Sequence, residues 1–370
     1  MPKLDTASMP FSVYLLAICQ ALMMSTSSLL IVVAALVGFS LAEDKSLATL
    51  PLSLQFLALM LTSIPASFIM QRWGRKAGFY LASVIGLMGG LLAIWAILNG
   101  SFWVFTAATA CVGVFNGFGN YFRFAAVDIA DESIKSKAIS YVMAGGVIAA
   151  FIGPNLAKLG KPLFESSIYA GAYVYVALIY TLMMVVLYFI KLPPAEVNKE
   201  QQKTRSVLEL FKQPKFLVAV ICSMFGYAVM SLVMTATPLA MKHNMHALDD
   251  TAFVIQWHVL GMFAPSFFTG SLIKRFGISN ILLAGVMFAY LAVTTNLLGT
   301  TVWHFWVGLL LLGLSWNFLF IGGTTLLTDA YLPAEKAKAQ ATNDFIVFST
   351  VASASLFAGY LQHYFGWQMV

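Results

Sequence analysis

The sequence predicts an all-α polytopic membrane protein, and three observations support this prediction. First, 60% of the 370 residues are hydrophobic and only 10% are charged, whereas a soluble domain carries about 25% charged residues. Second, apolar runs long enough to cross a bilayer recur along the chain. Third, most charges fall in the short segments between these runs. So few charges cannot solvate a globular surface, which excludes a cytosolic enzyme, a secreted disulfide scaffold and a nucleic-acid-binding protein.

Eleven apolar runs have spanning length. They lie at residues 11–37, 48–70, 77–98, 102–129, 138–157, 168–191, 215–240, 251–273, 279–299, 302–329 and 339–362. The first run is too long for the apolar core of a cleavable signal peptide, so we interpret it as a true span.

One long polar stretch, residues 192–214, interrupts the series after the sixth run. Its prolines, Pro193, Pro194 and Pro214, break helical structure. We therefore expect an N-terminal bundle at 1–191, a cytoplasmic linker at 192–214, and a C-terminal bundle at 215–370 with five helices and the start of a sixth.

The basic residues predict the orientation of the chain. With the N-terminus in the cytoplasm, 16 of the 21 lysines and arginines fall on the cytoplasmic side and 4 on the outer side, while Arg123 lies within a span. Cytoplasmic loops are enriched in Lys and Arg. We expect an integral protein of a bacterial inner membrane with a cytoplasmic N-terminus.

The two halves of the chain repeat. A shift of 201 residues places Asn116 on Asn317 and Asp128 on Asp329, and it aligns the two Lys-x-Lys-Ala runs that begin at 135 and 336. A shift of 203 residues places Arg72 on Arg275, Gly74 on Gly277 and Gln55 on His258. Parallel repeats with a solute site between them are a known transporter architecture.

The loop between the second and third spans resembles motif A of the major facilitator superfamily. Arg72, Gly74, Arg75 and Lys76 match that motif, although Gln71 stands where the family has an aspartate. Segment 270–277 is a partial second copy that includes Arg275 and Gly277. The resemblance covers nearly the whole chain in topology.

This resemblance implies two six-helix bundles related by pseudo-two-fold symmetry, which move a solute by alternating access. The twelfth helix is apparently absent, because the sequence stops just after Gly366 and Trp367. That helix is either missing from this sequence or lost in this member.

Two departures weigh against a drug/proton antiporter. Such antiporters carry an arginine in the fourth span where this chain has Gly113. Their Gly-Pro motif in the fifth span is matched only in part, by Gly145, Gly146 and Gly153 with Pro154.

Charged residues at membrane depth are costly and therefore point to function. The resemblance implies a gate ion pair between Asp128 and the basic loop after span 2, and a similar pair between Asp329 and Arg275. Asp344, two turns into the eleventh span, has the apolar Met143 as its repeat counterpart. We interpret Asp344 as either a latch to the basic loop or a protonation site.

Arg123 is the cation deepest in a span. It lies five residues before Asp128, so the two do not share a helix face. Arg123 then either belongs to a structural network or binds an anionic or strongly polar ligand. His258 is a second candidate proton carrier, because its side chain titrates near neutral pH.

The polar and aromatic residues of the spans suggest a hydrogen-bonding substrate site that accepts aromatic solutes. The candidates for this cavity are Gln20, Ser25, Asn116, Asn120, Arg123, Tyr227, Ser231, Trp316 and Asn317. We predict no metal site, since the run His243-Asn-Met-His246 is explained by an outer loop. No Walker loop, nucleophile elbow or CxxC is present, so we predict no cofactor and no enzyme activity.

We therefore expect a secondary active transporter of a small organic solute, coupled to protons. Its expected partners are the solute, protons and the lipid bilayer, with no nucleic acid, and we expect a monomer. The direction stays open: export of amphiphiles fits the motif A loop, and uptake of a vitamin, siderophore or organic anion fits Arg123 and the missing antiporter arginine. A more remote alternative is a substrate-sensing receptor or a channel on a transporter fold.

Overall fold

The computed structural model describes residues 9–131, 134–164, 167–193, 205–332 and 335–370, and the regular elements in these ranges are all helices. Within these ranges, ten helices are long and apolar enough to cross a membrane, and the number rises to eleven when a bent helix pair is counted as one span. The eleven predicted spans are confirmed by this count. The N-terminal half contains α1 (Phe11–Leu41), η1 (Lys45–Leu47), α2 (Leu50–Trp73), α3 (Arg75–Leu98), α4 (Phe102–Gly119), α5 (Phe122–Ile129), α6 (Lys135–Leu159), η3 (Lys161–Leu163) and α7 (Ala170–Phe189). The C-terminal half follows with α8 (Val207–Phe211), α9 (Pro214–His243), α10 (Leu248–Phe263), α11 (Ser266–Phe276), α12 (Ile278–Leu298), α13 (Val302–Thr328) and α14 (Lys336–Tyr364).

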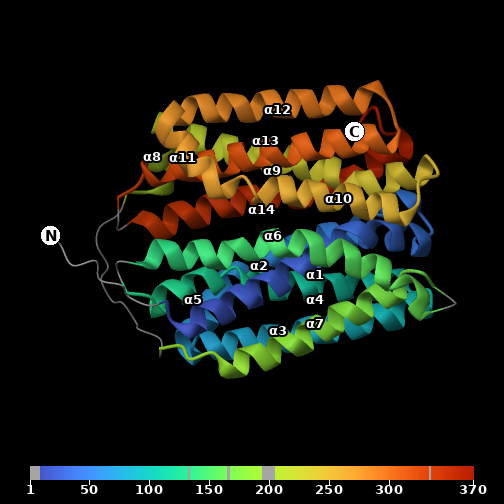
Figure 1. Cartoon of the computed structure of the whole chain (residues 1–370), viewed down its shortest axis with the longest axis horizontal. Helices are drawn as coiled ribbons and strands as arrows, with labels where there is room; N and C mark the ends of the chain where they lie inside the picture. The colour runs from blue at the N-terminus through green and yellow to red at the C-terminus, as the bar shows by residue number, and fades with distance from the viewer. Residues whose placement is uncertain (1–8, 132–133, 165–166, 194–204, 333–334) are drawn as a thin grey trace.

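The helices form two bundles that lie side by side along the long axis of the molecule (Figure 1). Helices α1–α7 form the lower bundle in this view, and α9–α14 form the upper one. We call the end that carries α8 the linker end (left in Figure 1) and the other end the far end. The site described below depends on how the two bundles meet along this axis.

Two of the predicted spans are interrupted. The fourth is divided into α4 and α5 at Asn120 and Tyr121, and the eighth into α10 and α11, which are bent by 44°. The second break falls at Pro265, whose missing N–H removes one helical hydrogen bond. The sequence predicted each of these spans as a continuous run, because both segments are apolar from end to end.

The motif A glycines hold the same backbone conformation in both halves. Gly74 has φ 86° between α2 and α3, and Gly277 has φ 81° between α11 and α12. A side chain is strained at such positive φ values, whereas glycine is not. The repeat inferred from the sequence is therefore visible in the structure at this turn.

Gly113 lies where α4 crosses α2 most closely. A Cβ atom at this position would collide with the backbone carbonyl of Gln55. A backbone atom cannot move aside as a flexible side chain can, so the space admits no arginine. The absence of the antiporter arginine thus has a packing reason in this chain.

We expect Gly113→Ala to lower the free energy of unfolding by about 1–3 kcal/mol, the usual range for overpacking. The measurement is the thermal unfolding midpoint of the purified chain in detergent. Gly270→Ala is the matched control, because a Cβ there meets no atom within 4 Å. Its expected effect is neutral or stabilising, by up to about 1 kcal/mol. Equal destabilisation in both variants would contradict the close approach of α2 and α4.

The end of the linker is bound to the C-terminal bundle by Arg205. Its Nε and Nη2 donate to the two carboxylate oxygens of Glu335, at 2.7 and 2.5 Å. Glu335 also accepts from the backbone N–H groups of Arg205 and Leu332, and its side chain is 1% exposed. The pKa of Glu335 is lowered to about 2, mainly by the hydrogen bond from the Arg205 guanidinium and to a smaller extent by that from the Leu332 N–H.

Glu335→Gln is expected to lower the thermal midpoint at pH 7 by a few degrees. The pKa of Glu335 is depressed in the folded chain, so its contribution is complete above the unfolded value near 4.5 and is lost as pH falls through about 2. The midpoints of wild type and variant should therefore converge as pH is lowered through this window. Glu43→Gln, at an exposed acid of the far end, is the control and should not shift the midpoint.

Candidate functional site between the two bundles

The two bundles are joined by hydrogen bonds at the far end. Lys161 forms an ion pair with Asp249 at 2.8 Å, and Asn155 donates to Gln256 at 3.1 Å. Between α2 and α14, Ser53 donates to the carbonyl of Ala352 at 2.7 Å. These contacts join the two halves at the far end.

Toward the middle of the molecule, two further contacts connect the halves. The Phe263 ring packs on Gly146, where a Cβ would collide with it, and Ser349 contacts the Met60 sulfur at 2.9 Å. Nearer the linker end, each described hydrogen bond or ion pair joins two residues of the same half, or a linker residue to one half. For example, Lys76 donates to the Ile190 carbonyl at 2.8 Å. The halves therefore meet at the far end and in the middle.

Arg123 and Asp344 are opposed across the two halves. Arg123 lies in the first turn of α5 in the N-terminal half, and Asp344 lies on α14 in the C-terminal half. The two charges interact electrostatically, and Tyr121 interacts with both. The Arg123 Nε is buried without a hydrogen-bond partner, and its guanidinium lies 4.9 Å from the Phe124 ring. The Asp344 carboxylate accepts a hydrogen bond from the neutral Asn343 side chain, whose Nδ2 donates at 3.2 Å.

An aromatic cluster lies beside this charge pair in the C-terminal half. The Trp316 and Phe320 rings stack at 5.0 Å, and the Tyr227 ring meets both edge-on at 5.4 and 5.3 Å. Phe348 lies 5.8 Å from Tyr227, and Phe263 lies 5.8 Å from Trp316. The Trp316 Nε1 is buried without a hydrogen-bond partner. We call these five residues the aromatic cluster.

Tyr227 and Phe348 of the cluster lie deeper in the molecule than Asp344. At about 1.5 Å per helical residue, Asp344 is about 12 Å and Phe348 about 18 Å from the start of α14. Tyr227 lies about 20 Å from the start of α9. Residues four apart share a helix face, so Asp344 and Phe348 point the same way. A ligand on the cluster therefore has the charge pair one turn nearer the linker end.

The sequence named Tyr227 and Trp316 but missed Phe263, Phe320 and Phe348. Two of the missed residues carried a usable signal. Phe320 follows Trp316 by four residues and Phe348 follows Asp344 by four, which places each on the face of a named candidate.

Of the two predicted gate pairs, the one in the N-terminal half is formed in the structure. The Arg75 Nε donates to the Asp128 carboxylate at 2.5 Å, as the resemblance to motif A implied. Among the described contacts, Arg275 lies over the Phe276 ring at 5.2 Å and no ion pair joins it to Asp329. Arg72 is exposed beside this gate.

Asn317 has a different role from the one predicted. Its Nδ2 donates to the Met262 carbonyl at 2.6 Å and to Ser266 at 2.7 Å, and its Oδ1 accepts from Thr269 at 2.6 Å. These bonds bridge the break between α10 and α11, so the amide is occupied by the protein itself. Its repeat partner Asn116 makes one long bond, to Ser27 at 3.3 Å, and its Oδ1 is buried without a partner.

The remaining candidates are two serines that donate to carbonyl groups and two residues with side-chain amides. Ser25 donates to the Ala21 carbonyl of its own helix at 2.7 Å, and Ser231 donates across to the Val351 carbonyl at 3.4 Å. Gln20 is buried within α1, and Asn120 is the C-cap of α4. These contacts give the two serines a packing role, since a hydroxyl bound to a carbonyl has already used its donor.

His258 is sealed between α10 and α13. Its side chain is 0% exposed, its Nδ1 lies 2.7 Å from the Leu309 carbonyl, and its Nε2 has no partner. Asp344 is half-buried, by contrast. Of the two coupling candidates, Asp344 is the one that solvent reaches in this conformation.

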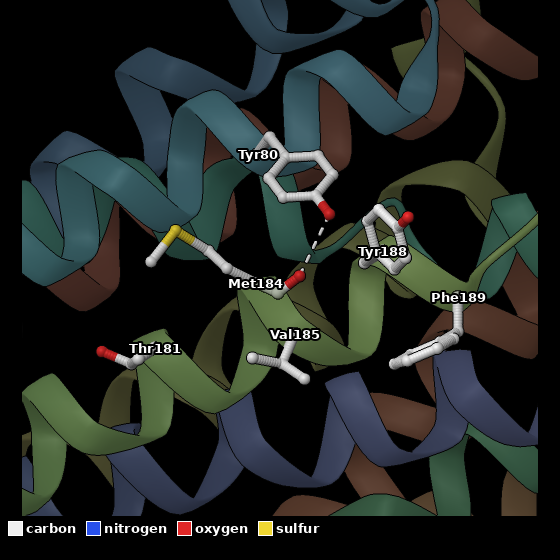
Figure 2. Close-up of a pocket in the computed structure, with 6 residues that line it drawn as sticks. All are labelled: Tyr80, Thr181, Met184, Val185, Tyr188 and Phe189. Carbon is white, nitrogen blue, oxygen red and sulfur yellow. Dashed lines mark hydrogen bonds between the residues drawn. The ribbon is translucent and has the colours of Figure 1, made fainter.

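A separate apolar pocket lies on the outside of the N-terminal bundle (Figure 2). Tyr80 of α3 and residues of α7 that include Met184 and Tyr188 form its walls, and the Tyr80 hydroxyl donates to the Met184 carbonyl at 3.1 Å. Tyr188 is 71% exposed, as expected for a lipid-facing residue. This pocket is thus separate from the site between the bundles. Among the described residues, no group of His, Cys, Asp and Glu side chains is arranged to hold a metal ion.

The fold and the site define a membrane transport protein, and the chain belongs to the Major Facilitator Superfamily, whose family model matches residues 16–293. It is 40% identical over 368 residues to the riboflavin transporter RfnT of Brucella anthropi, covering 99% of this chain and 92% of that protein. It is 28% identical to the uncharacterized MFS-type transporter YdeG of Bacillus subtilis, covering 89% and 80% of the two chains.

Solved structures share the fold. A D-xylose–proton symporter matches with a TM-score of 0.74 at 13% identity, covering 97% of this chain and 91% of its own. A bacterial homologue of the human lysosomal transporter Spinster matches with a TM-score of 0.72 at 16% identity, covering 96% and 82%. The predicted all-helical fold of this superfamily is confirmed.

Proposed function

We propose that this protein is an uptake transporter for riboflavin or a closely related flat heteroaromatic vitamin. The observation that carries the proposal is the 40% identity, over nearly the full length, to a riboflavin transporter. The aromatic cluster supports it, because flat rings bind well against aromatic side chains. The space at Gly113, which admits no arginine, weighs against drug/proton antiport.

We place the linker end in the cytoplasm of a bacterial inner membrane, as the distribution of basic residues predicts. In that orientation the bundles are joined by their contacts on the outer side, and we propose the linker end as the side of release. Alternation between this state and an outward-facing one would carry the solute inward. The pair of Arg75 with Asp128 is our candidate for a cytoplasmic gate.

We further propose that uptake is coupled to protons through Asp344. Its carboxylate is opposed to Arg123 across the two halves, so protonation would remove the attraction between them. A charge that changes at the interface of two moving bundles couples proton binding to conformation. The burial of His258 makes it the weaker candidate.

The test is riboflavin counterflow in proteoliposomes that contain the purified full chain. Vesicles preloaded with riboflavin should take up labelled riboflavin from outside, and liposomes without protein should not. An inward proton gradient should then drive net accumulation. Binding of riboflavin without flux would instead indicate a receptor, and a folded chain that neither binds nor moves riboflavin would overturn the proposal.

A further inference from the structure

We infer that the site between the bundles selects a flavin without net charge, and that Asp344 is the residue that excludes the phosphorylated form. The inference rests on the proposed function, because it assigns a charge class to the solute proposed above. It concerns a property that similarity to a transporter does not supply: how the site distinguishes riboflavin from flavin mononucleotide, which differs only by a terminal phosphate.

The charges of the site come as one balanced pair. Arg123 alone would make the site favourable for anions, because a guanidinium binds phosphate through strong charge-assisted hydrogen bonds. Asp344 cancels that preference, and it approaches from the opposite half of the molecule. The pair forms no direct ion pair in the part of the chain that the structure describes, so both groups are available to a ligand.

The position of Arg123 and Asp344 relative to the aromatic cluster fits the shape of a flavin. We place the three-ring system against Tyr227 and Phe348, with its sugar-alcohol chain toward the linker end, where the charge pair lies. Asp344 lies one helical turn from Phe348 in that direction, about 6 Å at 1.5 Å per residue. The end of the chain would then lie between Arg123 and Asp344.

Hydroxyl groups at this point satisfy both partners. A hydroxyl accepts from the guanidinium, including the buried Arg123 Nε that has no partner in the protein, and donates to the Asp344 carboxylate. A phosphate at the same point carries nearly two negative charges at pH 7.5 and only accepts hydrogen bonds. It would be attracted by Arg123 but repelled by Asp344, and such a like-charge contact is a common way to reject a wrong ligand.

The experiment compares riboflavin with flavin mononucleotide at pH 7.5, by quenching of tryptophan fluorescence in the detergent-purified full chain. The wild type should bind riboflavin about tenfold or more tightly than its phosphate ester. Asp344→Asn should raise the affinity for the ester relative to riboflavin by about tenfold or more. Arg123→Gln should shift the ratio the other way, and Asp344→Glu should keep the wild-type preference.

Asp131→Asn is the matched control, since it removes an exposed acid at the linker end by the same chemical change. If the ratio of affinities is the same in wild type, Asp344→Asn and Arg123→Gln, the inference is wrong while riboflavin binding stands. If the folded wild type binds neither flavin, the proposed function is wrong and the inference falls with it. Gel filtration and the melting midpoint establish that each variant is folded.

Discussion

Replacing Asp344 with asparagine is expected to abolish proton-driven accumulation of riboflavin while riboflavin exchange continues, because the asparagine amide oxygen can still accept a hydrogen bond from the solute. Accumulation needs a group that takes up and releases a proton, and the loss of a positioned proton-transfer group typically costs about 10²–10⁴ in rate. Counterflow needs only the binding site and the motion of the bundles. The measurement is uptake into proteoliposomes with and without an inward proton gradient.

The control for this result is again Asp131→Asn, which should respond to the gradient like the wild type. His258→Asn should also accumulate riboflavin, because His258 is sealed between α10 and α13. Undiminished gradient-driven accumulation in Asp344→Asn would remove Asp344 from the coupling mechanism. Loss of accumulation in the His258 variant alone would transfer the role to that histidine.

Replacing Asn317 with leucine is expected to destabilise the protein by about 2–4 kcal/mol, because buried polar groups would lose their partners. The Met262 carbonyl and Ser266 would be left unpaired beside Pro265, where the helix is already interrupted. The bend between α10 and α11 would then lose the side chain that bridges it. The thermal midpoint in detergent should fall by several degrees, and transport should fall with it.

The repeat supplies the matched control. Asn116→Leu is the same substitution at the equivalent position, where a single 3.3 Å bond to Ser27 is lost. Its expected cost is well under that of Asn317→Leu, about 1 kcal/mol or less. Equal melting shifts in the two variants would contradict the bridging role of Asn317.

The spans, the repeat and the superfamily could be predicted from the sequence because lipid imposes a simple rule. Every backbone polar group in a bilayer must be paired within its own segment, so each long apolar run becomes a helix. The glycines at 74 and 277 were visible as a repeated motif, and the structure shows that both hold positive φ. The break at Asn120 was not foreseen, because apolar composition continues through it, whereas Pro265 itself signals a kink in the eighth span.

The site was predicted only in part. Arg123 and Asp344 stood out because charges inside spans are rare, and the structure places them on opposite halves, where the two charges interact. Asn116 and Asn317 looked equivalent in the sequence, but the structure gives the first one weak bond and the second three short ones. Which amide is free for a ligand depends on the neighbouring helix.

The sequence by itself determined that this is a helical membrane protein of repeated halves, with two charges deep in its spans. Composition, periodicity and short motifs are local properties, and the bilayer converts them directly into helices. Only the tertiary structure decided that Arg123 is opposed to Asp344, that five aromatic residues gather in one cluster, and that Asn317 is occupied. Those facts depend on contacts between helices, of which the Asn317 bonds join residues 48 to 55 positions apart, and such contacts arise only when the helices pack together.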